Sequence, residues 1–313
     1  MIDHRSQNRS AGLPLAALVA GALALGSSPI LARMSELAPT ATAFYRVAFA
    51  VPALCLLPLF LTNGEVTRGS ADLTDSRVYF PIAAAGILFA LDLAFLHWSL
   101  RFTSIANSTL LLNSAPLFAG LFGWILFREP LRLRFLSGFV LAFGGVVLLV
   151  RGSSAAADSQ GLGNGLALLA GAAYGGYLIA ISRLRRQVAT GPIMIISSLS
   201  CALCLLPLAV ALGESLVPLT PRAWAILIAL GLITHAAGQG LVAFAFKALP
   251  ASTSSAVLLL QPIVAAIGSW LLFGERLTPL QLLGGVIVLM GVYLCGPSSR
   301  GEQARTSAEA SPR

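Results

Sequence analysis

The stretch LLLNSAPLFAGLFGWILF at residues 110–127 recurs as AVLLLQPIVAAIGSWLLF at residues 256–273. The two copies align without a gap at an offset of 146, and the alignment continues for a further 21 positions. Fourteen aligned positions are identical, among them Pro116 and Pro262. A match of this length predicts that the chain consists of two related halves.

The composition identifies the solvent of most of the chain as lipid. Hydrophobic residues make up 57% of the 313 positions and charged residues 10%, against roughly 25% charged in soluble domains. Apolar runs of about 20 residues, long enough to cross a hydrocarbon layer of ~30 Å, recur along the sequence. We place ten of them, at 14–32, 40–61, 79–100, 104–127, 133–150, 162–182, 191–212, 223–246, 251–273 and 280–295. They are too long and too uniformly apolar for barrel strands, so we expect an all-α membrane protein with ten transmembrane helices.

The number of segments in each half sets the relation between the halves. A shorter match at an offset of 150 aligns residues 17–22 with residues 167–172, so each half has five segments. Because five is odd, the second half enters the membrane upside down, which is the inverted repeat typical of secondary transporters. The expected organisation is a cytoplasmic N-terminus at 1–13, repeats at 14–150 and 162–296 joined by an external linker at 151–161, and a disordered cytoplasmic tail at 297–313.

The basic residues predict the orientation. Of the 20 Lys and Arg residues, fourteen fall in alternate gaps and the two termini, five fall in the other gaps, and Arg46 lies within a segment. The positive-inside rule therefore places both termini in the cytoplasm. The net charge of +8 forms no basic stripe with interleaved aromatic residues, so we expect no nucleic-acid partner.

Several motifs resemble the EamA family of the drug/metabolite transporter superfamily. They are FALDLAFLHWSL at 89–100, TSIANSTLL at 103–111, APLF at 115–118 and FREPL at 127–131, with second copies ASTSSA at 251–256, QPIV at 261–264, FGERL at 273–277 and GGV at 284–286. The resemblance covers essentially the whole chain. It implies ten helices in inverted repeats in a bacterial cytoplasmic (inner) membrane, and export or exchange of amino acids or other small metabolites without a cofactor.

Asp92 and Arg46 are ionisable residues at membrane depth, where such groups are costly and mark transport pathways. At 1.5 Å per residue both lie at similar depth, slightly outside the midplane, so they could form an ion pair lining an outward vestibule. An unpaired Asp92 would be protonated in apolar surroundings and could couple transport to protons. The alternative is structural, with Arg46 extending to the surface and Asp92 satisfied by a hydroxyl.

A group of neutral polar residues is expected near the midplane. His235 and Gln239 are four apart and therefore share a helix face. The same depth arithmetic adds Asn113, Tyr174, Tyr177 and Gln261. These side chains could line a substrate cavity, or they could hold helices together through hydrogen bonds.

The repeated prolines and glutamates have distinct expected roles. Pro116 and Pro262 remove helical hydrogen bonds at equivalent positions, which predicts kinks that act as hinges or are simply accommodated by neighbouring helices. Glu129 and Glu275 lie in short turns before helices, where we expect structural roles, with Arg132 or Arg276 nearby to pair with them.

Two other classes of function are less consistent with the sequence. An integral-membrane enzyme would need a catalytic constellation, and no such motif or metal-binding cluster occurs in the sequence. A passive channel remains the alternative to a carrier, although the polar groups differ between the two halves.

Overall fold

The computed structural model describes residues 4–61, 76–128, 133–152, 158–185, 187–249 and 257–295. These residues form helices joined by short connections, with no β-strand among them. The helices are α1 (His4–Met34), α2 (Pro39–Leu61), α3 (Ser76–Phe102), α4 (Ile105–Leu112), α5 (Ala115–Phe127), α6 (Leu133–Gly152), α7 (Asp158–Leu184), α8 (Thr190–Ala211), α9 (Pro221–Ala229), the π-helix η1 (Leu230–Ala237), α10 (Gly238–Ala248), α12 (Leu260–Phe273) and α13 (Pro279–Cys295). The predicted tail at 297–313 and Glu129 lie outside the described residues.

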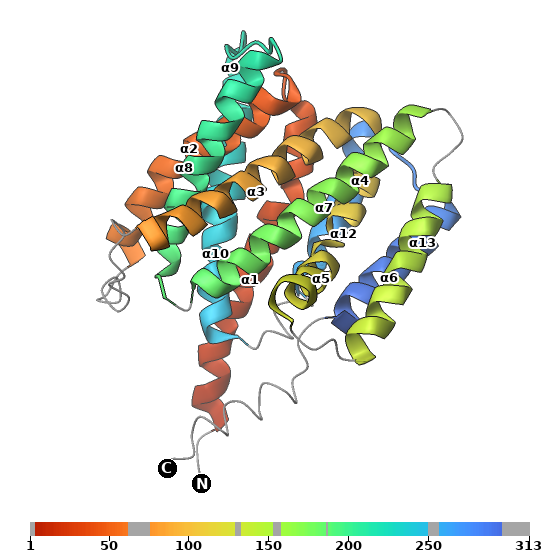
Figure 1. Cartoon of the computed structure of the whole chain (residues 1–313), viewed down its shortest axis with the longest axis horizontal. Helices are drawn as coiled ribbons and strands as arrows, with labels where there is room; N and C mark the ends of the chain where they lie inside the picture. The colour runs from red at the N-terminus through yellow and green to blue at the C-terminus, as the bar shows by residue number, and fades with distance from the viewer. Residues whose placement is uncertain are drawn as a thin grey trace.

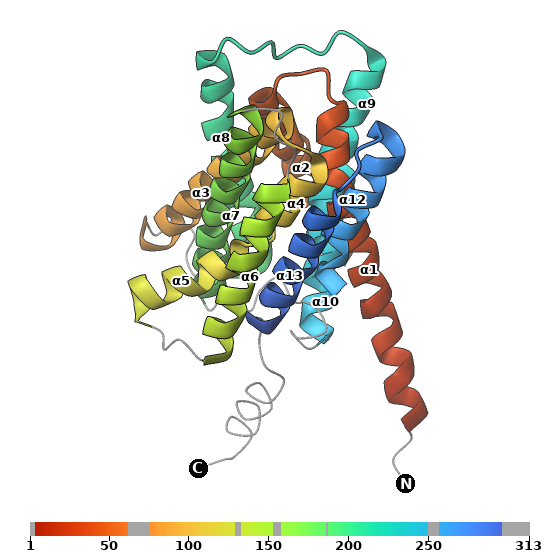
Figure 2. The ribbon, with the colours of Figure 1, turned by 90° about the vertical axis from the view of Figure 1, so that its right-hand side faces the viewer.

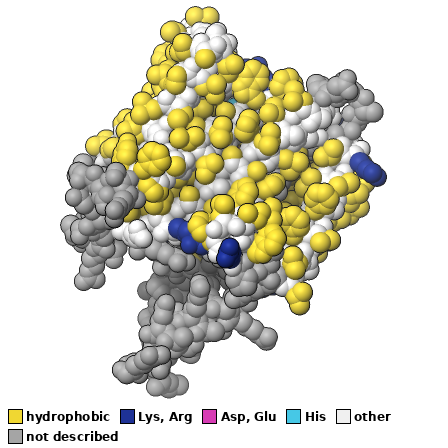
Figure 3. All heavy atoms as spheres, viewed as in Figure 1, with side chains coloured by type: hydrophobic (Ala, Val, Ile, Leu, Met, Phe, Trp, Pro, Cys, Tyr) yellow, Lys and Arg dark blue, Asp and Glu magenta, His cyan; other side chains and the backbone are white. Residues whose placement is uncertain are grey.

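The expected all-helical class is confirmed for the described residues. Among the described residues, eight helical segments are long and apolar enough to cross a membrane, and two shorter apolar helices, α12 and most of α13, follow them. Large hydrophobic side chains such as Leu133, Val140, Leu203 and Leu271 are exposed. Figure 3 shows such side chains covering the face in view. An apolar surface of this extent suits contact with lipid rather than water.

The helix contacts recur when each helix is replaced by the equivalent helix of the other half. Helix α6 packs on α13 and α2 packs on α8. The contact of α3 with α7 is matched by that of η1 and α10 with α1, and the contact of α5 with α7 is matched by that of α12 with α1 (Figures 1 and 2). Each of these contacts therefore has a counterpart at the corresponding position of the other half.

Glycines bring α6 and α13 into close contact. A Cβ atom on Gly145 would lie 2.7 Å from the carbonyl oxygen of Gly284, and one on Gly291 would lie 2.6 Å from the carbonyl oxygen of Gly138. Gly138 and Gly284 hold equivalent repeat positions, as do Gly145 and Gly291. Because the later residue of each helix meets the earlier residue of the other, α6 and α13 run antiparallel.

Loops gather at one end of the bundle, opposite the end at which α1 begins and α13 finishes (Figure 2). We call this end, formed by residues 35–38, 103–104, 212–220 and 274–278, the polar end. Hydrogen bonds at this end join the two halves. For example, the Glu214 carboxylate accepts the backbone N–H groups of Thr40 and Ala41 at 3.3 and 2.6 Å. A carboxylate at these positions compensates the positive N-terminal end of α2.

Candidate functional site

Buried polar side chains from α2, α3 and η1 form the core of the candidate site. Arg46 is 6% exposed, Asp92 and His97 are each 3% exposed, and His235 is 2% exposed. Tyr174 and Tyr177 of α7 are half-buried and pack against the same apolar core as Val47 and Leu93. The structure therefore brings five of the predicted site residues together, namely Arg46, Asp92, Tyr174, Tyr177 and His235.

Arg46 and Asp92 interact electrostatically without touching. In the part of the chain that the structure describes, no ion pair with an N–O distance of 4.0 Å or less joins them. Asp92 Oδ1 and Arg46 Nε also have no hydrogen-bond partner among the described residues. The two ionisable side chains are thus buried near each other with polar atoms that lack partners, and their direct pairing stays a prediction.

A row of rings extends along the site. The Phe89 ring lies 4.9 Å from that of Tyr177 and 5.5 Å from that of His235, and the Tyr174 and Tyr177 rings are 5.9 Å apart. Ser198 Oγ lies 3.2 Å from His235 Nε2, so α8 contributes a hydroxyl to the row. Ser198 was not among the predicted site residues, because nothing in its local sequence distinguishes it from a packing serine.

Close packing at two glycines holds the site helices near each other. Gly231 of η1 lies against α2, where a Cβ atom would be 2.5 Å from Phe49 Cβ. Gly86 of α3 lies against α8, where a Cβ atom would be 2.5 Å from the carbonyl oxygen of Ser197. The first contact lies one turn from His235, and the second lies less than two turns from Asp92.

His97 lies five positions after Asp92 on α3 and therefore on a different face of that helix. Its Nδ1 lies 2.7 Å from the carbonyl oxygen of Leu93 on the same helix, and no hydrogen bond to Asp92 occurs among the described residues. The His97 ring nevertheless lies within electrostatic reach of Arg46. His97 therefore borders the site through Arg46, a relationship that helix periodicity along α3 alone could not predict.

The helices that carry the repeated prolines are interrupted at equivalent places. Helix α4 ends at Leu112 and α5 begins at Ala115, with Pro116 in its first turn. In the second half, residues 257–258 are helical, Leu259 forms a turn, and α12 then begins at Leu260, just before Pro262. Both prolines are thus near a helix start, where a missing N–H is tolerated.

Each interruption packs against a glycine of the other half. A Cβ atom on Gly175 of α7 would lie 2.6 Å from the carbonyl oxygen of Ala115, and one on Gly26 of α1 would lie 2.9 Å from the carbonyl oxygen of Gln261. Ala115 and Gln261 are equivalent repeat positions. The two breaks therefore occupy matching environments.

Three further predicted site residues are not joined to the buried cluster. Asn113, Gln239 and Gln261 are each half-buried, and no side-chain hydrogen bond connects them to it within the described ranges. The Asn113 amide instead donates to the carbonyl oxygen of Thr109 at 2.7 Å. Between His235 and Gln239 the π-helix gives way to α10 at Gly238, so α-helical spacing does not apply along the whole interval.

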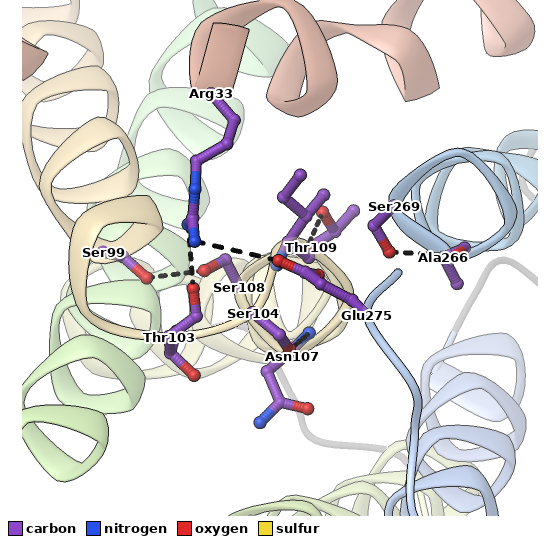
Figure 4. Close-up of polar contacts among 11 residues, drawn as sticks. Arg33, Ser99, Thr103, Ser104, Asn107, Ser108, Thr109, Ala266, Ser269 and Glu275 are labelled. Atoms are coloured by element: carbon purple, nitrogen blue, oxygen red, sulfur yellow. Dashed lines mark hydrogen bonds and ion pairs between the residues drawn. The ribbon is translucent and has the colours of Figure 1, made fainter. Parts of the chain in front are cut away.

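The polar end contains a second group of charged residues (Figure 4). Glu275 accepts the Ile105 N–H at 2.9 Å, and its other oxygen lies 3.8 Å from Arg33 Nη2. Arg33 Nη1 also donates to the carbonyl oxygen of Thr103 at 3.2 Å. The ion-pair partner of Glu275 is Arg33 of the first half and not the neighbouring Arg276. Nothing in the sequence around Glu275 indicates this contact between the halves.

The chain is similar to known transporters along its length. The model of the EamA-like transporter family matches residues 12–151 and 161–296. "Uncharacterized transporter YwfM" of Bacillus subtilis (strain 168) is 30% identical over 212 residues, covering 67% of this chain and 70% of that protein. "Probable terminal-alkyne amino-acid exporter" of Streptantibioticus cattleyicolor is 26% identical over 213 residues, covering 68% of this chain and 71% of that protein.

Solved structures share the fold, among them one crystal structure. It superposes with a TM-score of 0.59 at 17% sequence identity, over 96% of this chain and 99% of the other. At this identity the likeness concerns the fold alone.

Proposed function

The chain belongs to the EamA-like transporter family, and on this premise we propose that it is a secondary transporter that exports small metabolites by alternating access. The proposed substrates are amino acids or related compounds. The proposed location is the bacterial inner membrane, with ten spans and both termini in the cytoplasm.

The observation that carries the proposal is the antiparallel packing of α6 on α13 through equivalent glycines. Two five-helix repeats at 14–150 and 162–296, inverted relative to each other, account for this contact and for the matched contacts of the other helices. Inverted repeats allow a carrier to exchange inward-open and outward-open states, because each half can adopt the conformation of the other. A passive channel or an enzyme has no need of such a relation.

The matched interruptions near Pro116 and Pro262 are the proposed hinges. At each one a helix is broken within the bundle, so that its two parts can change angle without breaking further helical hydrogen bonds. The contacts at Gly175 and Gly26 place both breaks against the first helix of the opposite half.

The proposed cavity comprises Arg46, Asp92, Asn113, Tyr174, Tyr177, His235, Gln239 and Gln261. Five of these residues already lie together, and the other three lie at or near the helix breaks or in the helix after η1. A change of angle at the breaks is the proposed way in which they join the pathway.

Export of amino acids is supported by one relative, whose name describes it as a probable terminal-alkyne amino-acid exporter. Both charges of an amino acid would need partners in a membrane site. Arg46 and Asp92 supply one group of each sign. Coupling to protons through Asp92 is the corresponding proposal for the energy source.

Counterflow in proteoliposomes tests the function. Purified protein is reconstituted into liposomes preloaded with a mixture of amino acids and common metabolites, and mass spectrometry follows which compounds leave. A carrier gives saturable efflux of one chemical class that an external substrate stimulates. Flux that neither saturates nor responds to external substrate would instead support the alternative, a passive channel or pore.

A further inference from the structure

An open groove lies along the first half of α6, away from the buried cluster. Its volume is about 690 Å³, and the described residues that line it all belong to this helix: Leu133, Arg134, Leu136, Ser137, Val140 and Leu141. Gly138, Ala142 and Gly145 of the same helix lie against α13 instead. Helix periodicity therefore places the groove on a different face of α6 from the one that packs on α13.

An exposed apolar stripe continues the groove along α6. Val140, Phe143 and Val147 are exposed, and a Cβ atom on Gly144 would meet nothing within 4 Å. From Leu133 to Val147 the helix rises by about 21 Å, which exceeds the ~15 Å of hydrocarbon in one leaflet of a bilayer. The stripe is therefore long enough to hold an acyl chain over its full depth in that leaflet.

Arg134 is the charged residue of the groove. It is exposed in the first turn of α6, and no carboxylate of the described residues pairs with it. Ser137, the other polar residue of the lining, donates its hydroxyl hydrogen to the carbonyl oxygen of Arg134 at 3.0 Å. Arg128 ends α5 six positions earlier and is also exposed. The start of the groove therefore carries positive charge beside an apolar wall.

The equivalent face of the second half lacks this charge. Leu280 of α13 stands at the position equivalent to Arg134. Leu283 stands at the position equivalent to Ser137, and both leucines are exposed. The fold of the repeat thus does not require a basic residue here. Helix α6 starts where α13 finishes, at the proposed cytoplasmic end (Figure 2), and the anionic lipids of a cytoplasmic leaflet attract basic residues.

From these observations we propose that the groove binds one anionic phospholipid, with its phosphate on Arg134 and an acyl chain along the exposed stripe of α6. A guanidinium recognises phosphate oxygens through paired N–H donors. The acyl chain covers the apolar wall, which a free phosphate would leave bare. None of the lining residues belongs to the proposed substrate cavity, so the inference goes beyond the proposed transport function and does not depend on it.

Native mass spectrometry of the full-length protein in detergent tests the proposal, because it resolves each bound lipid molecule. The probes are phosphatidylglycerol and phosphatidylcholine with the same oleoyl chains, which differ in net charge. The first phosphatidylglycerol should bind at least about fivefold more tightly than the first phosphatidylcholine, the effect expected of one arginine near a membrane surface. Inorganic phosphate at constant ionic strength should not displace it.

Three variants at exposed positions separate the parts of the site. Arg134→Gln should reduce the preference for phosphatidylglycerol to about twofold or less. Arg185→Gln is the matched control and should keep the preference. It removes the same charge outside the groove but at the same end of the bundle, where Arg183 of α7 lies 3.5 Å from the ring centre of Phe127 of α5. Val140→Asn places an amide on the apolar wall and should weaken both lipids alike.

Four results would overturn the proposal. Equal affinities for the two lipids would show that the groove does not select negative charge, and equal losses in Arg134→Gln and Arg185→Gln would assign the preference to the general charge of this end. Displacement by inorganic phosphate would indicate a site for a free anion. Unchanged binding of both lipids in Val140→Asn would show that the acyl chain does not lie on the stripe.

Discussion

The Glu275 carboxylate lies 3.8 Å from Arg33 Nη2 while it accepts the N–H of Ile105 at 2.9 Å. A single side chain between α12 and α13 thus holds the end of α1 and the start of α4. The bond to Ile105 compensates the N-terminal end of α4, whereas the ion pair is long and Arg33 is 31% exposed. The hydrogen bond should therefore contribute more to stability than the ion pair.

Glu275→Ala should lower the free energy of unfolding by about 1–2 kcal/mol, because it removes a charge-assisted bond at a helix start. Urea or thermal unfolding in detergent measures the change. Arg276→Gln is the matched control, since this exposed neighbour makes no ion pair within the described residues and should change stability by less than about 0.5 kcal/mol. An equal loss of stability in both variants would show that the hydrogen bond from Glu275 to Ile105 is not the source of the effect.

The α6–α13 contact gives a second prediction with an internal control. Gly145→Ala places a methyl group 2.7 Å from a backbone oxygen that cannot move without shifting α13, and it should cost about 1–3 kcal/mol. Gly144→Ala on the same helix meets nothing within 4 Å and should be neutral or slightly stabilising. The same unfolding experiment separates them, and similar stabilities would argue against close packing of these helices.

The helical class was easier to predict from the sequence than the local geometry was. Long apolar runs and a gapless repeat depend on composition and spacing, which can be read directly from the sequence. The break between α4 and α5 was expected only as a kink at Pro116. Within it, the backbone N–H and the hydroxyl of Ser114 both donate to the carbonyl oxygen of Leu111, at 3.0 and 2.6 Å.

The site was only partly predictable for a similar reason. Depth arithmetic brought Arg46 and Asp92 to the same region because both helices cross the same layer. It could not foresee η1, whose π-helical turn coincides with the close approach of Gly231 to α2. It also could not foresee the pairing of Glu275 with Arg33, since the two residues belong to different halves.

The proposed hinges predict a kinetic defect. Pro116→Ala or Pro262→Ala restores a backbone N–H and favours a continuous helix, so the initial rate of counterflow should fall severalfold while stability is retained. Pro81→Ala in α3 is the control, because this exposed proline has no counterpart at the equivalent position of the second half. Rates equal to that of the unaltered protein in both hinge variants would remove the prolines from the mechanism.

The proposed orientation can be read by chemical labelling in intact cells. In a variant whose native cysteines are replaced, Ser215→Cys at the polar end should react with a membrane-impermeant maleimide. Gln187→Cys, in the exposed connection between α7 and α8, should react only after the cells are opened. The reverse pattern would place the polar end in the cytoplasm and invert the proposed direction of both termini.

Asp92→Asn should abolish any pH dependence of transport while the protein remains folded and inserted. In the proposed site the substrate ammonium and a proton would compete for the same buried carboxylate, so that release of one would favour binding of the other. The asparagine side chain can accept hydrogen bonds but takes up no proton in this way. Counterflow rates at a series of pH values measure the effect, with unfolding temperature and membrane yield as checks on folding.

Asp92→Glu keeps the carboxylate and should keep a pH dependence. If Asp92→Asn follows the same pH profile as the unaltered protein, another group carries the proton and Asp92 has no coupling role.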